Sequence, residues 1–275
     1  MNAAPARDVR AQQLERSDWA ASAGGLWRSA DELWPHMSEQ TNHVRAATAF
    51  AWDELLPERA AVLDLGCGPG WLTAQLSAQP RVARVLAWDS SPYLLGEVLP
   101  RMLELVGGDA DKIECICGEF VPLLLDDDAV DVVVMSSAFH HAEDPDALLG
   151  EIRRVLASAG VLVLLNETPW HPLRLLAFAT RHYLAAVLGI VGLRGPRAVG
   201  GLIPDGALYD PVLGDRAYTL RGWRTIAERN GWSLEVRGSG LAPYPRHQRR
   251  KALLEPDLHH LILRPQAPIA PRRGQ

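Results

Sequence analysis

One short stretch, residues 62–70, constrains this 275-residue chain more than any other. An apolar run over residues 61–65 predicts a buried parallel strand, and Gly66, Gly68 and Gly70 follow it at alternate positions before a helical pattern begins. Glycines at such a turn let the backbone come close to a ligand, because a side chain would fill the ligand's space. The alternative is a glycine-rich turn that serves packing alone.

The spacing of these glycines argues against two common phosphate-binding loops. A dinucleotide fingerprint has its third glycine where this chain has Trp71, which disfavours NAD and FAD. A P-loop is excluded more firmly, because no Gly-Lys-Ser/Thr follows to hold phosphates and magnesium. The acid of the strand, Asp64, would repel a pyrophosphate. It suits a ligand with a cationic amine and a ribose, which is the charge pattern of S-adenosylmethionine.

A second acid ends the next predicted strand. After a helical segment at residues 72–78, an apolar strand at 84–88 leads to Asp89, about twenty residues past the glycine loop. A carboxylate at the tip of this strand can accept hydrogen bonds from ribose hydroxyls. Taken alone, Asp89 would more often be a helix N-cap. Its distance from the loop favours the ribose interpretation.

These blocks resemble the class I S-adenosylmethionine-dependent methyltransferases of the small-molecule type, over roughly residues 60–167. The family's glycine loop, ribose strand, adenine-edge segment and fourth strand with its loop correspond in order to residues 62–70, 85–91, 117–120 and 131–141. The family's next helix, turn and strand resemble residues 153–160. The resemblance implies S-adenosylmethionine as cofactor. In-line methyl transfer depends mainly on alignment and requires no metal.

The resemblance implies which residues bind the cofactor. They are Asp64, Gly66, Cys67, Gly68, Gly70, Asp89, Ser90, Ser91, Gly118, Glu119, Phe120 and Ser136. The chain departs from the family at two places, with Glu119 where Asp is usual and Ala159-Gly160 where a double glycine is usual. Glu119 can still accept from the adenine amino group, and a solvated loop acid is the alternative.

Three further residues are candidates for catalysis. His140 and His141 follow the predicted fourth strand, whose carboxyl end should open beside the cofactor. A hydroxyl acceptor needs a base, and histidine suits that role near neutral pH. Glu167 follows the fifth strand and could orient the histidine. The alternatives are that a histidine caps the helix starting near Asp144, and that Glu167 caps or salt-bridges the next helix.

The alternation of apolar and helical segments predicts an α/β, Rossmann-like, doubly wound sheet. We expect seven mostly parallel strands, with an N-terminal helical cover and a lid inserted after strand five. The predicted strands are residues 61–65, 84–88, 113–117, 130–135, 160–165, 232–238 and 258–263. The predicted segments are a cover at 1–56, a cofactor-binding core at 57–167, a lid at 168–218, and a final helix with two strands at 219–275.

Net charge, cysteine count and the length of apolar stretches limit the binding partners and the cellular compartment that we expect. A formal net charge of −5 argues against nucleic acid, which typically requires a basic domain or stripe. Three cysteines form no paired disulfide framework, and the N-terminal residues lack a signal-peptide core, so we expect a cytoplasmic protein. The longest apolar stretch, 183–193, is too short to span a bilayer, so no stable membrane anchoring is expected. The sequence leaves open whether the protein forms a homodimer.

The sequence therefore predicts a methyltransferase that acts on a small organic acceptor, with oxygen as the preferred atom. Trp19, Trp27, Trp34 and Trp170 lie in the cover and lid segments, and this apolar, Trp-rich rather than basic character favours a natural-product or lipid-like substrate. The alternative for most of the four is a role in packing alone. Nitrogen or carbon acceptors are alternatives. So are a cyclase or isomerase that uses the same fold without methyl transfer, and a non-enzymatic cofactor sensor.

Overall fold

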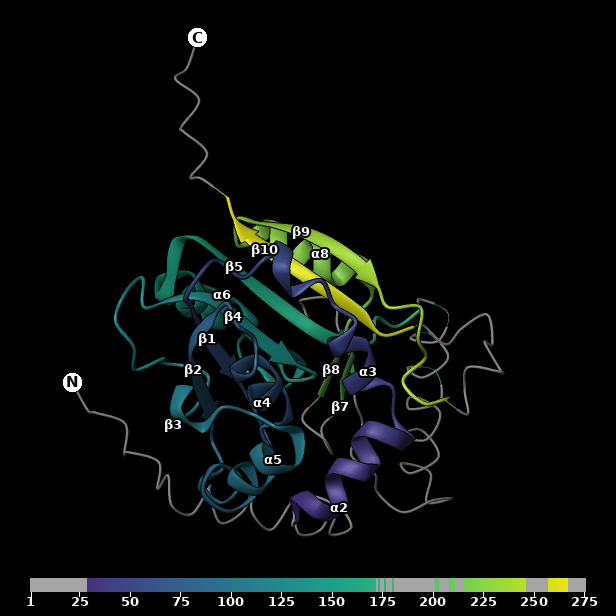
Figure 1. The fold of residues 1–275 in the computed structure, drawn as a ribbon. Coiled ribbons are helices and arrows are strands. Elements are labelled where there is room, and N and C mark those ends of the chain that lie inside the picture. The colour runs from purple at the N-terminus through teal and green to yellow at the C-terminus, as the bar shows by residue number, and fades with distance from the viewer. Residues whose placement is uncertain are drawn as a thin grey trace, which may run out of the picture.

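The computed structural model describes residues 29–171, 173, 176, 180, 201–202, 208–210, 215–245 and 257–266. Its main sheet has seven strands in the order β3-β2-β1-β4-β5-β10-β9 (Figure 1). The strands are β1 Ala60–Leu65, β2 Val82–Asp89, β3 Ile113–Cys117, β4 Val130–Ser136, β5 Leu156–Glu167, β9 Trp232–Gly238 and β10 His259–Pro265. β10 is antiparallel to β5 and β9, and the other pairs are parallel. This confirms the predicted fold class.

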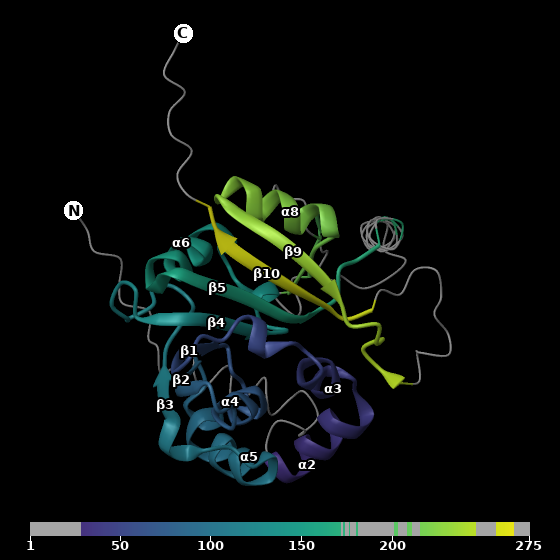
Figure 2. The same ribbon diagram turned by 45° about the horizontal axis from the view of Figure 1, so that its top comes forward.

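Helices lie on both faces of the sheet (Figure 2). They are α2 Ala30–Pro35, α3 His43–Thr48, α4 Trp71–Ser77, α5 Leu99–Val106, α6 Pro145–Val155 and α8 Leu220–Arg229. Short helical turns are η2 His36–Gln40, η3 Trp52–Glu54, η4 Leu94–Val98, η5 Ala110–Lys112 and η6 Phe139–His141. The cluster that contains α4 also contains α2 and α3, whereas α6 and α8 share the opposite cluster.

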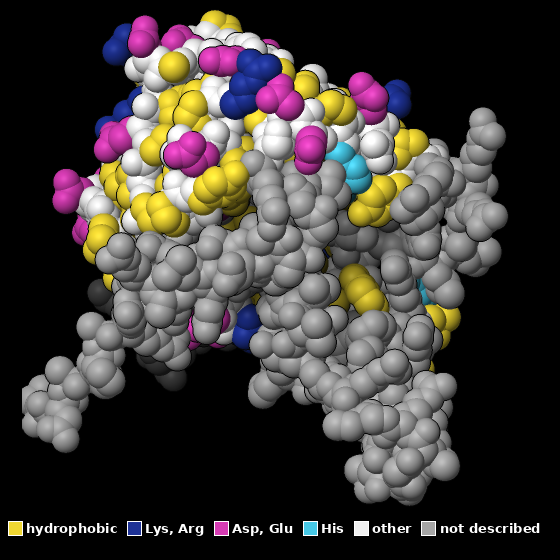
Figure 3. All heavy atoms as spheres, turned by 90° about the horizontal axis from the view of Figure 1, so that it is seen from below, with side chains coloured by type: hydrophobic (Ala, Val, Ile, Leu, Met, Phe, Trp, Pro, Cys, Tyr) yellow, Lys and Arg dark blue, Asp and Glu magenta, His cyan; other side chains and the backbone are white. Residues whose placement is uncertain are grey.

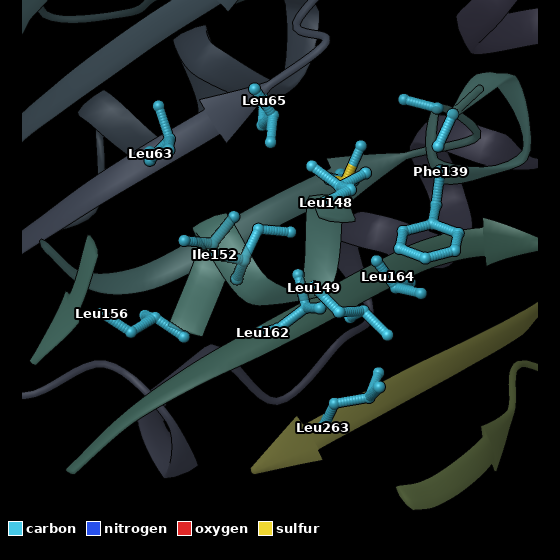
Figure 4. Close-up of a cluster of buried hydrophobic side chains, with 14 of the residues drawn as sticks. Leu63, Leu65, Phe139, Leu148, Leu149, Ile152, Leu156, Leu162, Leu164 and Leu263 are labelled. Carbon is cyan, nitrogen blue, oxygen red and sulfur yellow. The ribbon is translucent and has the colours of Figure 1, made fainter. Parts of the chain in front are cut away.

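Alternation along the strands separates these two layers. In β1, Val62 packs in the cluster with α4, and Leu63 and Leu65 pack in the cluster with α6. Figure 4 shows leucines of β1, β5 and β10 facing Leu148, Leu149 and Ile152 of α6. The central strands β2, β1, β4 and β5 are thus largely buried on both faces, as parallel sheets require, whereas the edge strand β3 is mostly exposed. The buried strands fix the positions of the loops at their carboxyl ends.

Two helix starts follow from their sequences. The Asp144 side chain accepts from the N–H groups of Asp146 and Ala147, both at 3.0 Å, and so caps α6. Thr219 accepts from the N–H of Gly222 at 3.0 Å and caps α8 as its hydroxyl predicts. Because Asp144 fills the cap of α6, neither neighbouring histidine is needed there.

The fifth strand is longer than predicted. It begins at Leu156 and not near residue 160, and its register against β4 shifts between Val130 and Val132. The bulge absorbs the residues that resembled a turn. The predicted lid also holds a small antiparallel sheet that the sequence did not indicate, made of β6 Gly201–Leu202, β7 Leu208–Asp210 and β8 Asp215–Ala217.

Acidic and basic side chains are interspersed over the coloured part of the face in Figure 3. On the described surface, Arg101 of α5 pairs with Asp31 of α2 at 2.7 Å and with Glu104 at 2.6 Å. Exposed pairs of this kind stabilise by less than about 1 kcal/mol each. Across the described residues, no helix has the length and apolar character needed to cross a membrane. Trp19 and Trp27 lie outside the described residues.

Candidate functional site

The glycine loop is fastened to the second strand. The N–H groups of Gly66 and Cys67 both donate to the Trp88 carbonyl, at 2.8 and 3.0 Å. Gly66 has φ +73, and a Cβ there would lie 2.9 Å from the Cβ of Ala138. A larger residue would therefore be strained by its backbone and would clash with the loop after β4. The glycine loop and the loop bearing His140 are in close contact as a result.

Asp89 connects the glycine loop to the end of β2. Its Oδ2 accepts from the Gly68 N–H at 2.9 Å, and its Oδ1 accepts from the Ser91 N–H at 2.8 Å. The Ser91 hydroxyl in turn accepts from the Leu94 N–H at 3.3 Å, so Ser91 is positioned to cap the following turn. The half-buried carboxylate of Asp89 therefore lies at the strand tip beside the glycines, as predicted.

Asp64 faces inward and not into solvent. It is 1% exposed, and its Oδ2 accepts a 2.6 Å hydrogen bond from the Thr73 hydroxyl of α4. Burial raises the pKa of Asp64 from 3.8 to about 7, against the opposing effect of that hydrogen bond. Thr73, which the sequence reading missed, links strand to helix. Burial also raises the pKa of the neighbouring Cys67 thiol well above its ordinary value.

The adenine-edge segment packs on Trp88. The Gly118 N–H donates to the Asp89 carbonyl at 3.0 Å, and a Cβ at Gly118 would lie 2.5 Å from the indole ring. The indole Nε1 donates to the Glu119 carbonyl at 3.1 Å, while the Glu119 side chain is exposed. The Phe120 ring lies beside Gly66, 3.2 Å from a Cβ placed there. The segment thus borders the glycine loop.

The fourth and fifth strands end in a polar cluster. The Asn166 side chain donates to the Ser136 hydroxyl at 3.0 Å, and the Ser137 hydroxyl donates to the Asn166 carbonyl at 3.2 Å. Ser137 has φ +50 and Asn166 has φ +60, in the left-handed region that non-glycine residues rarely adopt. Two strained residues at facing strand ends are typical of functional sites.

His140 and Glu167 form the pair that the sequence suggested. His140 Nδ1 lies 3.3 Å from Glu167 Oε2, and Glu167 is only 4% exposed. His141 is exposed, with its ring centroid 4.3 Å from that of His140. The structure therefore joins two of the three catalytic candidates and leaves His141 at the surface.

His260 of β10 is a further buried group at this end of the sheet. Its Nδ1 accepts from the backbone N–H of Asn166 at 3.4 Å. Its ring packs edge-on against Phe50, with 5.2 Å between the ring centroids. Burial lowers the pKa of His260 to about 4, so the ring is neutral near pH 7. Neither His260 nor Thr73 belongs to a local motif. Only the antiparallel pairing of β10 with β5 brings His260 beside Asn166.

The donor set at the ends of β1, β2 and β3 fits a nucleoside ligand with little phosphate. Glycines allow close approach at one side, and the Asp89 carboxylate stands where ribose hydroxyls need acceptors. No run of lysine and hydroxyl side chains follows the loop to hold phosphates. The fold and this loop define a nucleoside-binding open α/β sheet.

Comparison with known proteins identifies the family. Residues 63–164 match the family model described as a methyltransferase domain. A trans-aconitate 2-methyltransferase from Azoarcus sp. (strain BH72) is 32% identical over 210 residues, covering 73% of this chain and 76% of that protein. A malonyl-acyl-carrier-protein O-methyltransferase from Halorhodospira halophila (strain DSM 244 / SL1) is 30% identical over 166 residues, 58% of this chain and 52% of that protein.

Solved structures share the fold at low identity. The DhpI–SAM–HEP complex aligns with a TM-score of 0.53 and 18% identity, covering 95% of this chain and 100% of that one. The 4+2 cyclase SpnF aligns with a TM-score of 0.55 and 14% identity, covering 82% and 81%. The chain belongs to the class I S-adenosylmethionine-dependent methyltransferases, and it is a small-molecule methyltransferase with S-adenosylmethionine as methyl donor.

Proposed function

We propose that this enzyme transfers a methyl group to a hydroxyl oxygen of a small organic acceptor, with His140 as general base and Glu167 as the group that orients it. The contact of 3.3 Å between His140 Nδ1 and Glu167 Oε2 supports this proposal most directly. A base held by a third group recurs wherever a weak nucleophile must be activated. Burial of Glu167 strengthens its electrostatic effect on the ring.

S-adenosylmethionine, when bound, supplies a methyl group on a positively charged sulfur. In our proposal the backbone of Gly66, Gly68 and Gly70 borders it, and Asp89 accepts hydrogen bonds from its ribose. Gly118 and Phe120 flank the adenine edge. Two other members of the predicted set act through these: Asp64 anchors the loop through Thr73, and Ser91 holds Asp89. The contact between Gly66 and Ala138 supports bringing this ligand next to the loop of His140.

The proton transfer involves the two nitrogens of His140. With Nδ1–H donating to Glu167 Oε2, Nε2 carries the lone pair that accepts the acceptor's hydroxyl proton. The hydroxyl oxygen then forms its bond to the methyl carbon, and the carbon–sulfur bond breaks with its electrons left on sulfur. The imidazolium formed on His140 is stabilised by the adjacent Glu167 carboxylate. General-base catalysis of this kind contributes about 10²- to 10⁴-fold.

We also infer that residues 168–218 form a lid. In this proposal the lid recognises the substrate, whereas the core at residues 57–167 binds the cofactor. Two contacts support this. The Trp170 N–H donates to the Tyr218 carbonyl at 2.8 Å, so the segment's two ends meet. Arg216 of β8 donates to the carbonyls of Ala142 and Glu143, directly after the histidine loop. We propose that the 1–56 cover, of which the structure describes residues 29–56, encloses the acceptor together with this lid.

A second candidate is esterification of a carboxylate, because the relatives' names specify trans-aconitate and a malonyl group. A carboxylate is already ionised at neutral pH, so it needs no base. Under this alternative, substitution of His140 would leave methyl transfer nearly unchanged. The Glu167 carboxylate argues against esterification, because a buried carboxylate repels an anionic acceptor.

The test is mass spectrometry of purified enzyme incubated with S-adenosylmethionine and a pooled panel of phenols, aliphatic alcohols, amines, carboxylic acids and trans-aconitate. Products heavier by one CH₂ and S-adenosylhomocysteine are scored together. The proposal expects methyl ethers from hydroxyl compounds. Methyl esters in their place would support the second candidate, and conversion of a compound at unchanged mass would support the cyclase alternative.

A further inference from the structure

The carboxyl end of β5 holds two consecutive polar side chains that are buried with part of their hydrogen-bonding capacity unused. Asn166 is 2% exposed and Glu167 is 4% exposed. Within the described residues, Asn166 Oδ1 and Glu167 Oε1 are buried and have no hydrogen-bond partner. Leaving such an atom unpaired destabilises the folded protein, and more strongly for a charged group. A folded enzyme that keeps both indicates a ligand that pairs with them.

Both side chains are directed toward the end of β4. Asn166 donates to Ser136, the last residue of β4, and Glu167 contacts His140 in the loop that follows. In an ordinary strand, neighbouring side chains point to opposite faces. The positive φ of Asn166 breaks that alternation and allows both to face the same loop. That loop also contacts Gly66 through Ala138, on the cofactor side.

The two oxygens are also held in place. Asn166 is strained at φ +60, and its backbone N–H donates to Nδ1 of the buried His260. Glu167 pairs with His259 in the ladder between β5 and β10, so its backbone belongs to the sheet and not to a free loop. Strain held by a rigid surround is a mark of pre-organisation. Glu167 Oε1 therefore has a defined position before any acceptor arrives.

We propose that Glu167 also recognises the acceptor, with Oε1 accepting a hydrogen bond from a second hydroxyl group. One oxygen of this carboxylate orients His140, and the other selects the substrate. This inference rests on the proposed function, because it assumes that the acceptor lies beside His140. It names the acceptor class as small molecules with at least two hydroxyl groups, and it disfavours both purely apolar alcohols and carboxylic acids.

The expected selectivity follows from the unpaired oxygen. A site built to hydrogen-bond a substrate hydroxyl discriminates strongly against an analogue that lacks it, because the buried group is again left unpaired. A hydrogen bond to a charged group changes affinity by roughly tenfold to a hundredfold. A monohydroxy analogue of equal size and aromatic character should therefore bind more weakly by about tenfold or more.

The experiment measures binding by calorimetry in the presence of saturating S-adenosylhomocysteine, with catechol, resorcinol and phenol as probes. In the wild type, at least one of the two diols should bind about tenfold or more tightly than phenol. Glu167→Gln should reduce that ratio to less than about threefold, because the amide that replaces the carboxylate has no charge. Glu228→Gln, at an exposed position on α8, is the matched control and should keep the wild-type ratio.

Diols that bind no more tightly than phenol to the wild type, including no binding by any probe, would overturn the inference. So would a diol preference that Glu167→Gln leaves intact. Retained binding of S-adenosylhomocysteine by the variant shows that it is folded, and the wild-type comparison stands without it. Because no turnover is measured, failure here is distinct from failure of the base mechanism, which is tested by His140 variants acting on any hydroxyl acceptor.

Discussion

The ends of β1 and β2 contrast with the ends of β4 and β5. At the first, both acids are paired: the buried Asp64 with Thr73, and the half-buried Asp89 carboxylate with the N–H groups of Gly68 and Ser91. At the second, Asn166 and Glu167 are about as deeply buried as Asp64, but each keeps an oxygen without a partner in the described structure. The first end is complete before a ligand binds, whereas the second requires one.

This difference suits the two roles that we propose. A methyl donor that is the same in every turnover is bound by loops whose shape is fixed by internal hydrogen bonds. An acceptor must be distinguished from similar molecules, and unpaired buried groups penalise every molecule that fails to pair with them. The cost is carried by the folded protein as strain at Asn166 and as an unpaired carboxylate oxygen.

The largest expected effect comes from His140→Ala. The rate constant of methyl transfer to a hydroxyl acceptor should fall by about 10²-fold or more, because the base is lost. The dissociation constant for S-adenosylmethionine should stay within about twofold, measured by calorimetry. His141→Ala is the matched control, and it should keep most of the rate because that side chain is exposed and Glu167 contacts its neighbour. Equal losses in the two variants would contradict the assignment.

Asp89→Ala should act at the other end of the sheet. It removes the acceptor for the Gly68 and Ser91 N–H groups and for the proposed ribose contact. We expect binding of S-adenosylmethionine to weaken by about tenfold or more, since hydrogen bonds to charged groups are worth roughly 1.5–3 kcal/mol. The rate at saturating cofactor should change much less. A fall in that rate as large as the fall in affinity would show that the two ends are not separable.

A smaller effect is a fall in stability as pH rises, caused by Asp64. Its pKa is raised from 3.8 to about 7 in the folded chain, so the native state binds more protons than the unfolded state between these values. The unfolding free energy should therefore fall as pH increases from about 4 to 7. Asp64→Asn should remove a slope of about 1.4 kcal/mol per pH unit over this range, measured by denaturant unfolding at several pH values between about 4 and 8. An unchanged pH dependence would contradict the burial effect.

His260 should produce the opposite slope, with a similar or smaller magnitude. Its pKa is lowered from 6.5 to about 4, so the unfolded chain takes up a proton that the folded chain resists. The unfolding free energy should fall as pH decreases from about 6.5 to 4. His260→Gln should flatten that part of the curve in the same denaturation experiment. A variant whose curve matches the wild type below pH 6 would show that His260 is not buried as described.

The sequence predicted the first end of the sheet far better than the second. Asp64, Gly66 and Asp89 lie in contiguous motifs, where each strand runs directly into its loop, so local pattern is enough. The His140–Glu167 pair could be anticipated because parallel strand ends meet at one edge. Thr73 and His260 could not, because their partners lie on other elements and only packing brings them together. The unpaired oxygens and the strain at Asn166 are likewise visible only in three dimensions.

The most direct test of the central claim is a double-mutant cycle on His140 and Glu167, measured as the single-turnover rate of methyl transfer to a monohydroxy acceptor at saturating concentration, which does not use the proposed contact of Glu167 Oε1. If the two residues act as one base, His140→Ala with Glu167→Gln should be about as slow as His140→Ala alone, because Glu167 has nothing left to orient. Losses that multiply in the double variant would show independent roles, and they would contradict the pairing of His140 with Glu167 as the catalytic unit.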